Sequence, residues 1–377
     1  MKVLAVIGTR PEAIKMAPVV LAARRAGIDL RVCATAQHRE MLDQVLGLFG
    51  LVPDHDLDLM RPDQSLAELA SRALVALDPV LTRERPDWVL VQGDTTTAMI
   101  AGLAAFYRQI PVGHVEAGLR TRDLKRPFPE ELNRRVIDLF ARAHFVPTSS
   151  ARQNLLDEGV DDATVHVTGN TVVDALLQAR AMPCPESALA DVPRLAAGER
   201  LVLVTAHRRE SFGPGMESIA RAILRIVADF PDVRVIYPVH PNPNVRATME
   251  ASLTGHPRVH LTAPLPYLSF VHLMSRASLI VSDSGGVQEE APSLGVPALV
   301  LRETTERPEA IAAGAVRLVG VAEEGIVKAA REVLGDAHVH ARMARAVNPY
   351  GDGAASDRIV RILKAEPWTP FAPGTRG

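Results

Sequence analysis

Apolar and polar residues follow two different periods along the first half of this chain. Short runs rich in Val, Ile and Leu are typical of buried strands, and the longer stretches between them carry apolar residues at helical spacing. Strands are expected over residues 2–7, 88–91, 112–115 and 144–146, and helices over 11–25, 66–81 and 95–108. This strand–helix alternation predicts a parallel sheet with helices on both of its faces.

The pattern stops over residues 182–197, where Pro183, Pro185 and Pro193 stand among small and polar residues. It then restarts, with further strands expected over 201–204, 233–237, 259–261, 279–281 and 298–301. The chain has 377 residues, about the length of two domains. We therefore expect two α/β halves joined by a proline-containing linker, with a frayed tail over 366–377.

Composition and charge narrow the classes of function. Lys and Arg number 42 and Asp and Glu 44, so the chain lacks the global basic field that holds nucleic acid. Cys33 and Cys184 lie outside any CxxC motif, which argues against a disulfide framework and for a reducing compartment. The first apolar run is too short for a signal peptide or a membrane span. We expect a soluble cytoplasmic protein.

Ligands of open parallel sheets bind beyond the carboxyl ends of the strands, so the residues there are the first candidates for a site. After the first strand, Thr9 and Glu12 have capping-box spacing at a helix start. Arg10 and Lys15 add positive charge where free backbone N–H groups already favour an anion. This composition predicts a phosphate site, with a capped helix and a solvated basic face as the alternative. The dinucleotide motif GxGxxG is absent here.

Carboxylates follow the next two strands. Asp94 comes after residues 89–92, Glu116 ends the strand after it, and the loop beyond leads to Glu130 and Glu131. A helix N-cap would explain Asp94, and a helix-start charge would explain Glu130 or Glu131, but neither explains Glu116. Because clustered carboxylates repel, some should have raised pKa values and act as acids while others act as bases. The pattern suits general acid–base chemistry.

Histidines follow two strands of the second half. His207, flanked by two arginines, could contact a diphosphate, and a structural pair with Glu210 is the competing interpretation. His240 occupies a comparable position after the next strand. Neither histidine has a partner at metal-ligand spacing such as HExxH, so we predict no metal site.

The strongest anion-site signal is Ser284-Gly285-Gly286, between a buried strand and a helix. Two glycines at a helix start leave free N–H groups that a phosphate can approach closely. Glu290 on the helix can bind ribose hydroxyls, and Arg307 follows the next strand. A simple turn is the alternative for the glycine pair.

Together these segments resemble the non-hydrolysing UDP-N-acetylglucosamine (UDP-GlcNAc) 2-epimerase family. The matching segments are, in order, GTRPEAIKMAP, QGDTTT, HVEAGLRT, PFPEELNR, TGNTVVDA, TAHRRES, SDSGGVQEEAPSLG, TTERPEA and NPYGDG. They run from Gly8 to Gly353 and so cover nearly the whole chain. Each segment alone is a weak signal, but their joint occurrence is highly specific.

The resemblance implies an α/β fold of two Rossmann-like domains in the GT-B arrangement, with the active site in the interdomain cleft. The domains are expected over 1–182 and 198–350, with a C-terminal helix and tail over 351–377 packing back on the first. The family's catalytic positions fall on Asp94, Glu116, Glu130 and His207. Its nucleotide and substrate contacts fall on Arg10, Lys15, Ser284, Gly285, Gly286, Glu290 and Arg307, with Phe270 near the uracil. Positions that bind a second, activating UDP-GlcNAc in some relatives fall on Gln37, Gln44 and His240, for which ordinary polar surface is the alternative.

The implied reaction is reversible inversion at C2 of UDP-GlcNAc to give UDP-ManNAc, through loss and re-addition of UDP, for cell-surface polysaccharide precursors. The family is usually dimeric and needs no nicotinamide cofactor, so we expect a homodimer without a cofactor. Rival functions are a GT-B glycosyltransferase, a hydrolysing relative that releases ManNAc, and an epimerase of an oxidised diacetamido sugar. A nucleotide-sugar sensor without activity is the alternative outside enzymes.

Overall fold

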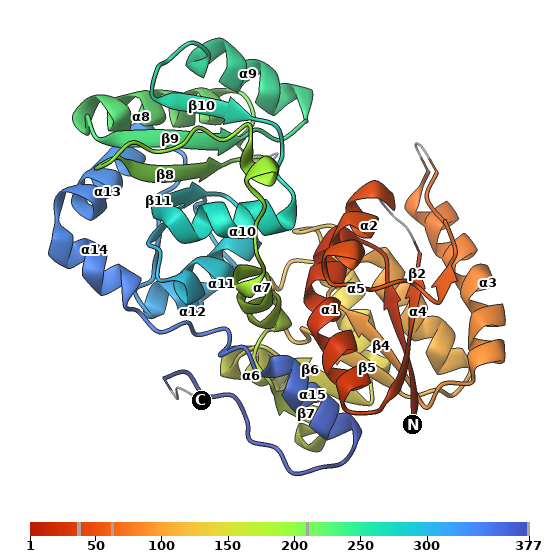
Figure 1. Ribbon diagram of the computed structural model, residues 1–377. Helices are drawn as coiled ribbons and strands as arrows, with labels where there is room; N and C mark the ends of the chain where they lie inside the picture. Colours follow the sequence, from red (N-terminus) through yellow and green to blue (C-terminus); the bar gives the residue numbers. More distant parts are fainter. Residues whose placement is uncertain (36–38, 62–63, 209–210, 375–377) are drawn as a thin grey trace. The chain divides into compact units, whose positions relative to one another are not determined.

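The computed structural model describes residues 1–35, 39–61, 64–208 and 211–374. The chain forms two compact units (Figure 1): unit 1 comprises Met1–Ala175 and Tyr350–Gly377, and unit 2 comprises Leu176–Pro349. The chain therefore passes from unit 1 to unit 2 within helix α7 (Thr171–Ala181) and returns next to Tyr350. The proline-containing stretch 183–197 lies inside unit 2.

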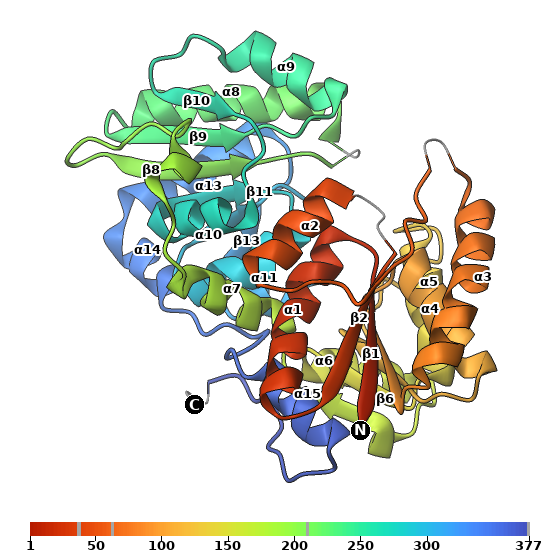
Figure 2. The same cartoon turned by 45° about the vertical axis from the view of Figure 1, so that its right-hand side comes forward.

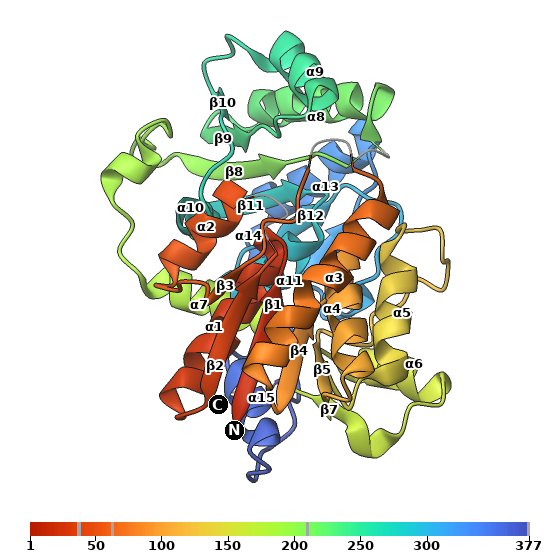
Figure 3. The ribbon, with the colours of Figure 1, turned by 90° about the vertical axis from the view of Figure 1, so that its right-hand side faces the viewer.

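Unit 1 is built on a parallel sheet of order β3-β2-β1-β4-β5-β6-β7. The strands are β1 (Lys2–Ile7), β2 (Asp29–Ala34), β3 (His55–Asp56), β4 (Trp88–Gln92), β5 (Val112–Val115), β6 (Ala143–Val146) and β7 (Val165–Val167). The helices are α1 (Arg10–Arg25), α2 (Arg39–Leu48), α3 (Leu66–Glu84), α4 (Thr96–Tyr107), α5 (Glu130–Phe140), α6 (Ser149–Asp157), the start of α7, and α15 (Ala355–Leu363), with a 3₁₀ turn at Asp162–Thr164. Figures 2 and 3 show α1 and α2 on one face of this sheet and α3, α4 and α5 on the other.

Unit 2 repeats the same plan with a parallel sheet of order β10-β9-β8-β11-β12-β13. The strands are β8 (Arg200–Thr205), β9 (Val233–Pro238), β10 (Val259–Thr262), β11 (Ala277–Ser282), β12 (Ala298–Val300) and β13 (Val316–Leu318). The helices are α8 (Pro214–Asp229), α9 (Pro243–Leu253), α10 (Tyr267–Arg276), α11 (Gly285–Leu294), α12 (Pro308–Ala312), α13 (Glu323–Gly335) and α14 (Ala337–Ala344), with a 3₁₀ turn at Glu186–Leu189.

Both strand orders have the Rossmann pattern, in which the direction of the crossovers reverses once. The reversal lies between β1 and β4 in unit 1 and between β8 and β11 in unit 2. Loops that leave the carboxyl ends of two such strands diverge to opposite faces and leave a crevice that binds ligands. Each unit therefore presents one topologically defined place for a site.

Apolar strands account for the two cores. In unit 1, Leu4, Val6, Val89 and Val91 pack with apolar residues of α3 and α4, and all four are buried. In unit 2, the inward residues of β8 and β9 pack against α8 and α13. Burying one such side chain contributes about 1.5–3 kcal/mol, so strands without polar interruptions are held firmly and the loops at their ends start from fixed points.

The C-terminal segment belongs to unit 1, where α15 packs against α1. Asp174 of α7 accepts the backbone N–H groups of Ala355 (3.3 Å) and Ser356 (2.8 Å), and so caps α15 with a side chain distant in sequence. Beyond the helix, Phe371 is buried and its N–H donates to the carbonyl of Val167 at 2.8 Å. The prediction of a frayed tail was wrong for residues 366–374, because this apolar anchor and backbone bond hold it.

Candidate functional site

The loops after β1 and β4, on either side of the reversal in unit 1, are joined by the carboxylate of Glu12. Its Oε2 accepts the backbone N–H groups of Gly8 (2.8 Å) and Thr9 (2.5 Å), and its Oε1 accepts the hydroxyl of Thr95 (2.6 Å). The predicted capping box is present. Burial raises the pKa of Glu12, and these hydrogen bonds oppose the rise. Arg10 begins α1 at this junction and is half-buried.

Glu116 follows β5 directly and is held by side chains from two other elements. Its Oε2 accepts from Nζ of Lys15 on α1 and from Nε2 of Gln92 at the end of β4, each at 2.5 Å. Glu116 has φ 65°, a left-handed conformation that is uncommon for a residue with a side chain. A buried carboxylate with an ammonium partner, on strained backbone beyond a strand, suits a chemical role better than a packing role.

Asp94 is not the N-cap of α4. Thr95 performs that role, since its hydroxyl accepts the N–H of Ala98 at 3.0 Å. The Asp94 carboxylate pairs instead with the guanidinium of Arg134 on α5, and its carbonyl accepts from Nδ2 of Asn133 at 2.8 Å. The helix-cap alternative for Asp94 was therefore wrong, and its half-buried carboxylate is oriented by α5.

Glu130 and Glu131, adjacent at the start of α5, have different environments. Glu131 is completely buried and accepts the backbone N–H groups of Thr121 (3.0 Å) and Arg122 (3.1 Å). It also lies 3.4 Å from the guanidinium of Arg134. Oε2 of Glu130 is buried without a hydrogen-bond partner among the described residues. Glu131 is thus committed to the backbone, and Glu130 keeps an oxygen available for chemistry.

Behind these loops lies a buried polar network that the sequence analysis did not predict. Nδ1 of His114 lies 2.6 Å from the carboxylate of Asp138, and its Nε2 lies 2.7 Å from the carbonyl of Gly93, next to Asp94. Arg120 also donates to Asp138, at 2.7 Å. Burial would raise the pKa of Asp138, but the charges of His114 and Arg120 hold it below its usual range. His114 and Arg120 lie in the HVEAGLR segment, and that was the available signal.

In unit 2, the loops after β8 and β11 meet at Asp283. This buried carboxylate accepts the backbone N–H groups of His207 (2.7 Å) and Arg208 (2.8 Å) through Oδ2. The ring of His240 stacks on that of His207, with centroids 5.3 Å apart and planes at 15°. Burial lowers the pKa of His207, while Asp283 acts in the opposite direction. Glu210, the competing partner for His207, lies outside the described residues.

The first turn of α11 contains the residues predicted to bind an anion. Ser284 is the N-cap residue but makes no side-chain capping bond within the described chain, so it leaves the first-turn N–H groups available. A Cβ on Gly285 would lie 2.7 Å from Nη1 of Arg307, so only glycine lets this guanidinium approach the helix start. Arg307 is itself held by Glu289 at 2.7 Å and by Glu306.

The electrostatics of this site follow from its paired charges. Burial would raise the pKa of Glu306, but Arg307 and Arg302 bring it down to about 2. Glu290 is buried on α11 and accepts the hydroxyl of Tyr267 at 2.9 Å. Phe270 is half-buried on α10, which packs against α11. The structure therefore brings Ser284, Gly285, Gly286, Glu290 and Arg307 to one helix and its neighbours.

The described residues that were predicted to bind an activating UDP-GlcNAc lie in different units. Gln44 is exposed on α2, His240 is exposed beside His207, and Gln37 lies outside the described residues. Residues 1–35, 39–61, 64–208 and 211–374 contain no group of three or more His, Cys, Asp or Glu side chains arranged to hold a metal ion. Across those same residues, every helix is too short or too polar to cross a membrane.

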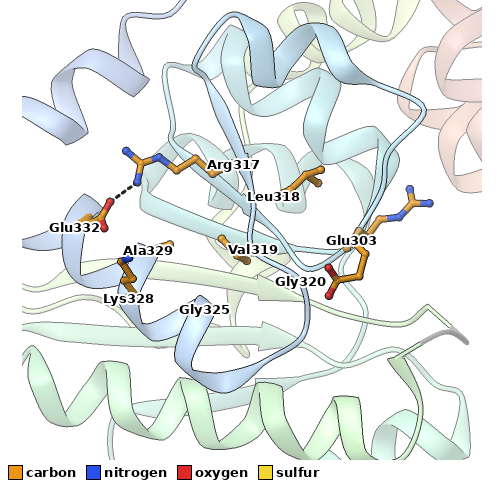
Figure 4. Close-up of a pocket in the computed structure, with 10 residues that line it drawn as sticks. Glu303, Arg317, Leu318, Val319, Gly320, Gly325, Lys328, Ala329 and Glu332 are labelled. Atoms are coloured by element: carbon orange, nitrogen blue, oxygen red, sulfur yellow. Dashed lines mark hydrogen bonds and ion pairs between the residues drawn. The ribbon is translucent and has the colours of Figure 1, made fainter.

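A pocket of about 480 Å³ opens elsewhere in unit 2, beside β13 and α13 (Figure 4). Its charged lining is mixed in sign, and Arg317 donates to Glu332 across it at 2.6 Å. The residues that line it include none of those predicted for the site. None of its lining residues belongs to the loops after β8 and β11, where the strand order reverses, so the topology does not favour this pocket as the place of the chemistry.

Comparison with known proteins gives one family over almost the full chain. The sequence profile described as UDP-N-acetylglucosamine 2-epimerase matches residues 21–364. The UDP-N-acetylglucosamine 2-epimerase of Escherichia coli (strain K12) is 53% identical over 370 residues, covering 97% of this chain and 98% of that protein. The enzyme of that name from Bacillus subtilis is 50% identical over 364 residues, covering 96% and 95%.

Comparison with solved structures gives the same family. A UDP-GlcNAc 2-epimerase from Neisseria meningitidis bound to UDP-GlcNAc has a TM-score of 0.91 at 48% identity, covering 97% of this chain and 100% of that one. A UDP-GlcNAc 2-epimerase from Methanocaldococcus jannaschii in complex with UDP-GlcNAc and UDP has a TM-score of 0.82 at 35% identity, covering 97% and 100%. The kitacinnamycin glycotransferase, 13% identical with a TM-score of 0.65, shares the fold alone. With the two parallel sheets, these matches confirm the predicted fold class of two Rossmann-like units of GT-B type.

The contrast between Glu130 and Glu131 predicts unequal losses of stability when each is replaced. Glu131→Ala should lower the free energy of unfolding by about 3 kcal/mol, because two buried N–H groups lose a charged acceptor and Arg134 loses a partner. Glu130→Ala should cost less than about 1 kcal/mol, because the lost oxygen has no bond to break. Urea unfolding of the two variants measures both values. Equal losses would show that Glu130 is as structural as its neighbour.

Proposed function

Because this chain belongs to the UDP-N-acetylglucosamine 2-epimerase family, we propose that it interconverts UDP-GlcNAc and UDP-ManNAc without hydrolysing either. The observation that carries the proposal is the set of carboxylates beyond β4 and β5. Asp94 is held by the buried guanidinium of Arg134 and Glu116 by the partly buried ammonium of Lys15, and Glu130 has an oxygen without a partner among the described residues. These polar groups supply acid–base chemistry, and unit 2 supplies an anion site.

The chemistry of the sugar explains why both kinds of site are needed. The hydrogen on C2 is not adjacent to a ketone, so its direct removal would give a poorly stabilised carbanion. We propose that a base takes the C2 proton while the C1–O bond breaks, so that UDP leaves with the bond's electron pair and a C1–C2 double bond forms. UDP then re-adds to C1 as an acid delivers a proton to the opposite face of C2. Inversion at C2 results, and no redox cofactor takes part.

The carboxylates of unit 1 supply the two proton-transfer groups. A base and an acid on opposite faces of the sugar are the minimum requirement, and Asp94, Glu116 and Glu130 exceed it. Lys15 supports the proposal because its ammonium fixes Glu116 in one orientation. Positioning of this kind converts a bimolecular proton transfer into one between groups already in place.

The segments of unit 2 would hold UDP through the whole cycle. The N-terminus of α11, with Ser284, Gly285 and Gly286, favours a diphosphate by its free N–H groups and helix dipole. Arg307 and His207 add positive charge where negative charge grows as the C1–O bond breaks. Glu290 is proposed to bind the ribose hydroxyls and Phe270 to lie near the uracil. Arg10 of unit 1 is proposed as a further contact to the nucleotide.

Retention of UDP separates this function from its rivals. A glycosyltransferase would need one essential proton-transfer group and an acceptor surface, and a hydrolase would admit water to the intermediate. An oxidised diacetamido sugar would call for an additional cation near C6. We also keep the proposal of an activating second UDP-GlcNAc at Gln37, Gln44 and His240. The stacking of His240 on His207 supports this proposal, because a ligand bound at His240 would contact a ring that lies directly against the proposed catalytic His207.

We further propose a homodimer located in the cytoplasm. Large apolar side chains are exposed on adjacent helices of unit 1, among them Val75 (74%), Phe106 (52%), Tyr107 (66%) and Leu139 (85%). Exposed apolar side chains gathered on neighbouring helices are typical of a protein–protein interface, and a second copy would bury them symmetrically. The free cysteines Cys33 and Cys184 suit a reducing compartment. Products of the proposed reaction would serve cell-surface polysaccharide synthesis.

The decisive experiment is NMR of UDP-GlcNAc incubated with the protein in deuterated water. We expect UDP-ManNAc to appear with deuterium at C2 of both sugars. Asp94→Asn, Glu116→Gln and Glu130→Gln should each slow the reaction at least about 100-fold. Asp157→Asn, an exposed carboxylate at the end of α6, is the control and should leave the rate unchanged. Free ManNAc and UDP would point to hydrolysis, and full exchange in all three variants would exclude the carboxylates.

Two glycines at helix ends of unit 2 give a matched test of the anion site. Gly285→Ala should weaken UDP binding at least about tenfold, because the new methyl group displaces the guanidinium of Arg307 from the helix start. Gly335→Ala at the end of α13 is the control, because its Cβ would meet nothing nearer than 3.9 Å and the residue lies outside the proposed site, so affinity should change little. Isothermal titration with UDP measures both. Equal affinity of the two variants would argue that Arg307 does not contact the diphosphate.

A further inference from the structure

The backbone that carries His207 is clamped from two sides by buried polar side chains. On one side, the hydroxyl of Tyr237 on β9 donates to the carbonyl of Ala206 at 2.9 Å. On the other, Oδ2 of Asp283 accepts the N–H groups of His207 and Arg208 at 2.7 and 2.8 Å. Tyr237 and Asp283 are both fully buried. Three residues that leave the end of a strand without regular structure are therefore held in one conformation.

The second oxygen of Asp283 faces the imidazole itself. Oδ1 lies 3.2 Å from Nδ1 of His207, an ion-pair contact when the ring is protonated, and it makes no hydrogen bond with the described residues. An ionised carboxylate only accepts hydrogen bonds, so this approach is favourable when Nδ1 carries the proton. Nε2 lies across the ring from Nδ1. The His207 side chain is 36% exposed, while that of Asp283 is 0% exposed. One edge of the ring therefore lies against a buried carboxylate, and part of the side chain is exposed.

We propose that Asp283 is a positioning residue, which holds His207 as the Nδ1–H tautomer and leaves Nε2 to receive the diphosphate of the substrate. This inference rests on the proposed function, because it assigns the geometry of a histidine already proposed to act there. Nε2 takes up a proton from solvent as the diphosphate binds, and it then donates a hydrogen bond to a phosphate oxygen. Asp283 compensates the positive charge that results, and no covalent bond to His207 forms or breaks.

Charged neighbours set the direction of the effect on titration. Among the described residues, the ionisable groups that face His207 are Asp283 after β11, Arg208 beside it and His240 after β9. Burial, Arg208 and His240 lower the pKa of His207, and Asp283 raises it. Removing the charge of Asp283 should therefore lower the pH at which His207 gains its second proton.

Asp283→Asn separates the two functions of the carboxylate. The amide oxygen can still accept the two backbone N–H groups, which requires the NH₂ group to face Nδ1 of His207. Nδ1 must then accept, so the proton moves to Nε2 and the tautomer is reversed. A neutral His207 could still donate a hydrogen bond from Nε2, but it would lack the positive charge that Asp283 compensates in the unmodified protein. Because this charge acts on the leaving diphosphate as the C1–O bond breaks, we expect kcat to fall at least about 100-fold.

Tyr237→Phe is the matched control. It removes the clamp on Ala206 but leaves the contact between Asp283 and the imidazole, so it tests whether ordering of the loop alone explains the effect. We expect its kcat to fall less than about tenfold. Its tautomer should remain that of the unmodified protein.

The test is ¹⁵N NMR of the histidine side chains of the full-length protein and both variants, combined with kcat and KM for UDP-GlcNAc. In the unmodified protein the proton of neutral His207 should reside on Nδ1, a measurement that needs no variant to fold. In Asp283→Asn it should move to Nε2, the titration midpoint should fall, and kcat should drop with KM changed less than about tenfold.

A proton on Nε2 in the unmodified protein would overturn the proposal, as would a reversed tautomer with unchanged kcat. An equal loss of kcat in Tyr237→Phe without a tautomer change would also overturn it, since loop order would then suffice. These outcomes are distinct from failure of the proposed function. If the unmodified protein did not epimerise UDP-GlcNAc, the tautomer would still be measured, and only its purpose would be in doubt.

Discussion

Buried carboxylates that each accept two consecutive backbone N–H groups hold the irregular parts of this structure in place. Glu12 accepts from Gly8 and Thr9, Glu131 from Thr121 and Arg122, Asp283 from His207 and Arg208, and Asp174 from Ala355 and Ser356. A buried N–H group without an acceptor is costly, and hydrogen bonds to a charged acceptor contribute about 1.5–3 kcal/mol each. Loops at strand ends lack the regular bonds of helices and sheets. The carboxylates replace those bonds and make the loops rigid enough to position chemistry.

This arrangement separates two kinds of acidic residue. Glu12, Glu131, Asp283 and Asp174 are almost fully buried and directed at the backbone. Asp94 and Glu116 are directed at cationic side chains, and Glu130 retains an unpartnered oxygen among the described residues. A cationic side chain that pairs with a carboxylate can move away or be replaced by a substrate. A loop that loses the acceptor of its N–H groups loses its conformation. The first kind of acid therefore fixes the geometry, and the second kind is available for proton transfer.

Sequence reasoning could predict the features that depend on local pattern. The β/α alternation, the capping box at Thr9 and Glu12, and the glycine pair that begins α11 are all local, and each is present in the structure. Partners distant in the chain could not be predicted. Asp283 is 76 positions from His207, and Arg134 is 40 positions from Asp94.

Sequence reasoning also could not distinguish the roles of adjacent residues. Neighbouring positions on a helix point about 100° apart, so at the start of α5 Glu131 faces the backbone of another loop and Glu130 does not. The same limit explains the N-cap of α4, where Thr95 rather than Asp94 has the backbone geometry of a cap. Only the fold decides which of two neighbouring side chains is used for structure and which remains for chemistry.

The central claim is that unit 2 holds UDP while its bond to the sugar is broken and remade. Positional isotope exchange tests it most directly, with UDP-GlcNAc carrying ¹⁸O in the oxygen that bridges C1 and the β-phosphorus. If the C1–O bond breaks and UDP is retained, the label should move into the non-bridging oxygens of the β-phosphate, in both UDP-GlcNAc and UDP-ManNAc. A label that stays in the bridge while C2 inverts would contradict elimination and the role assigned to the anion site.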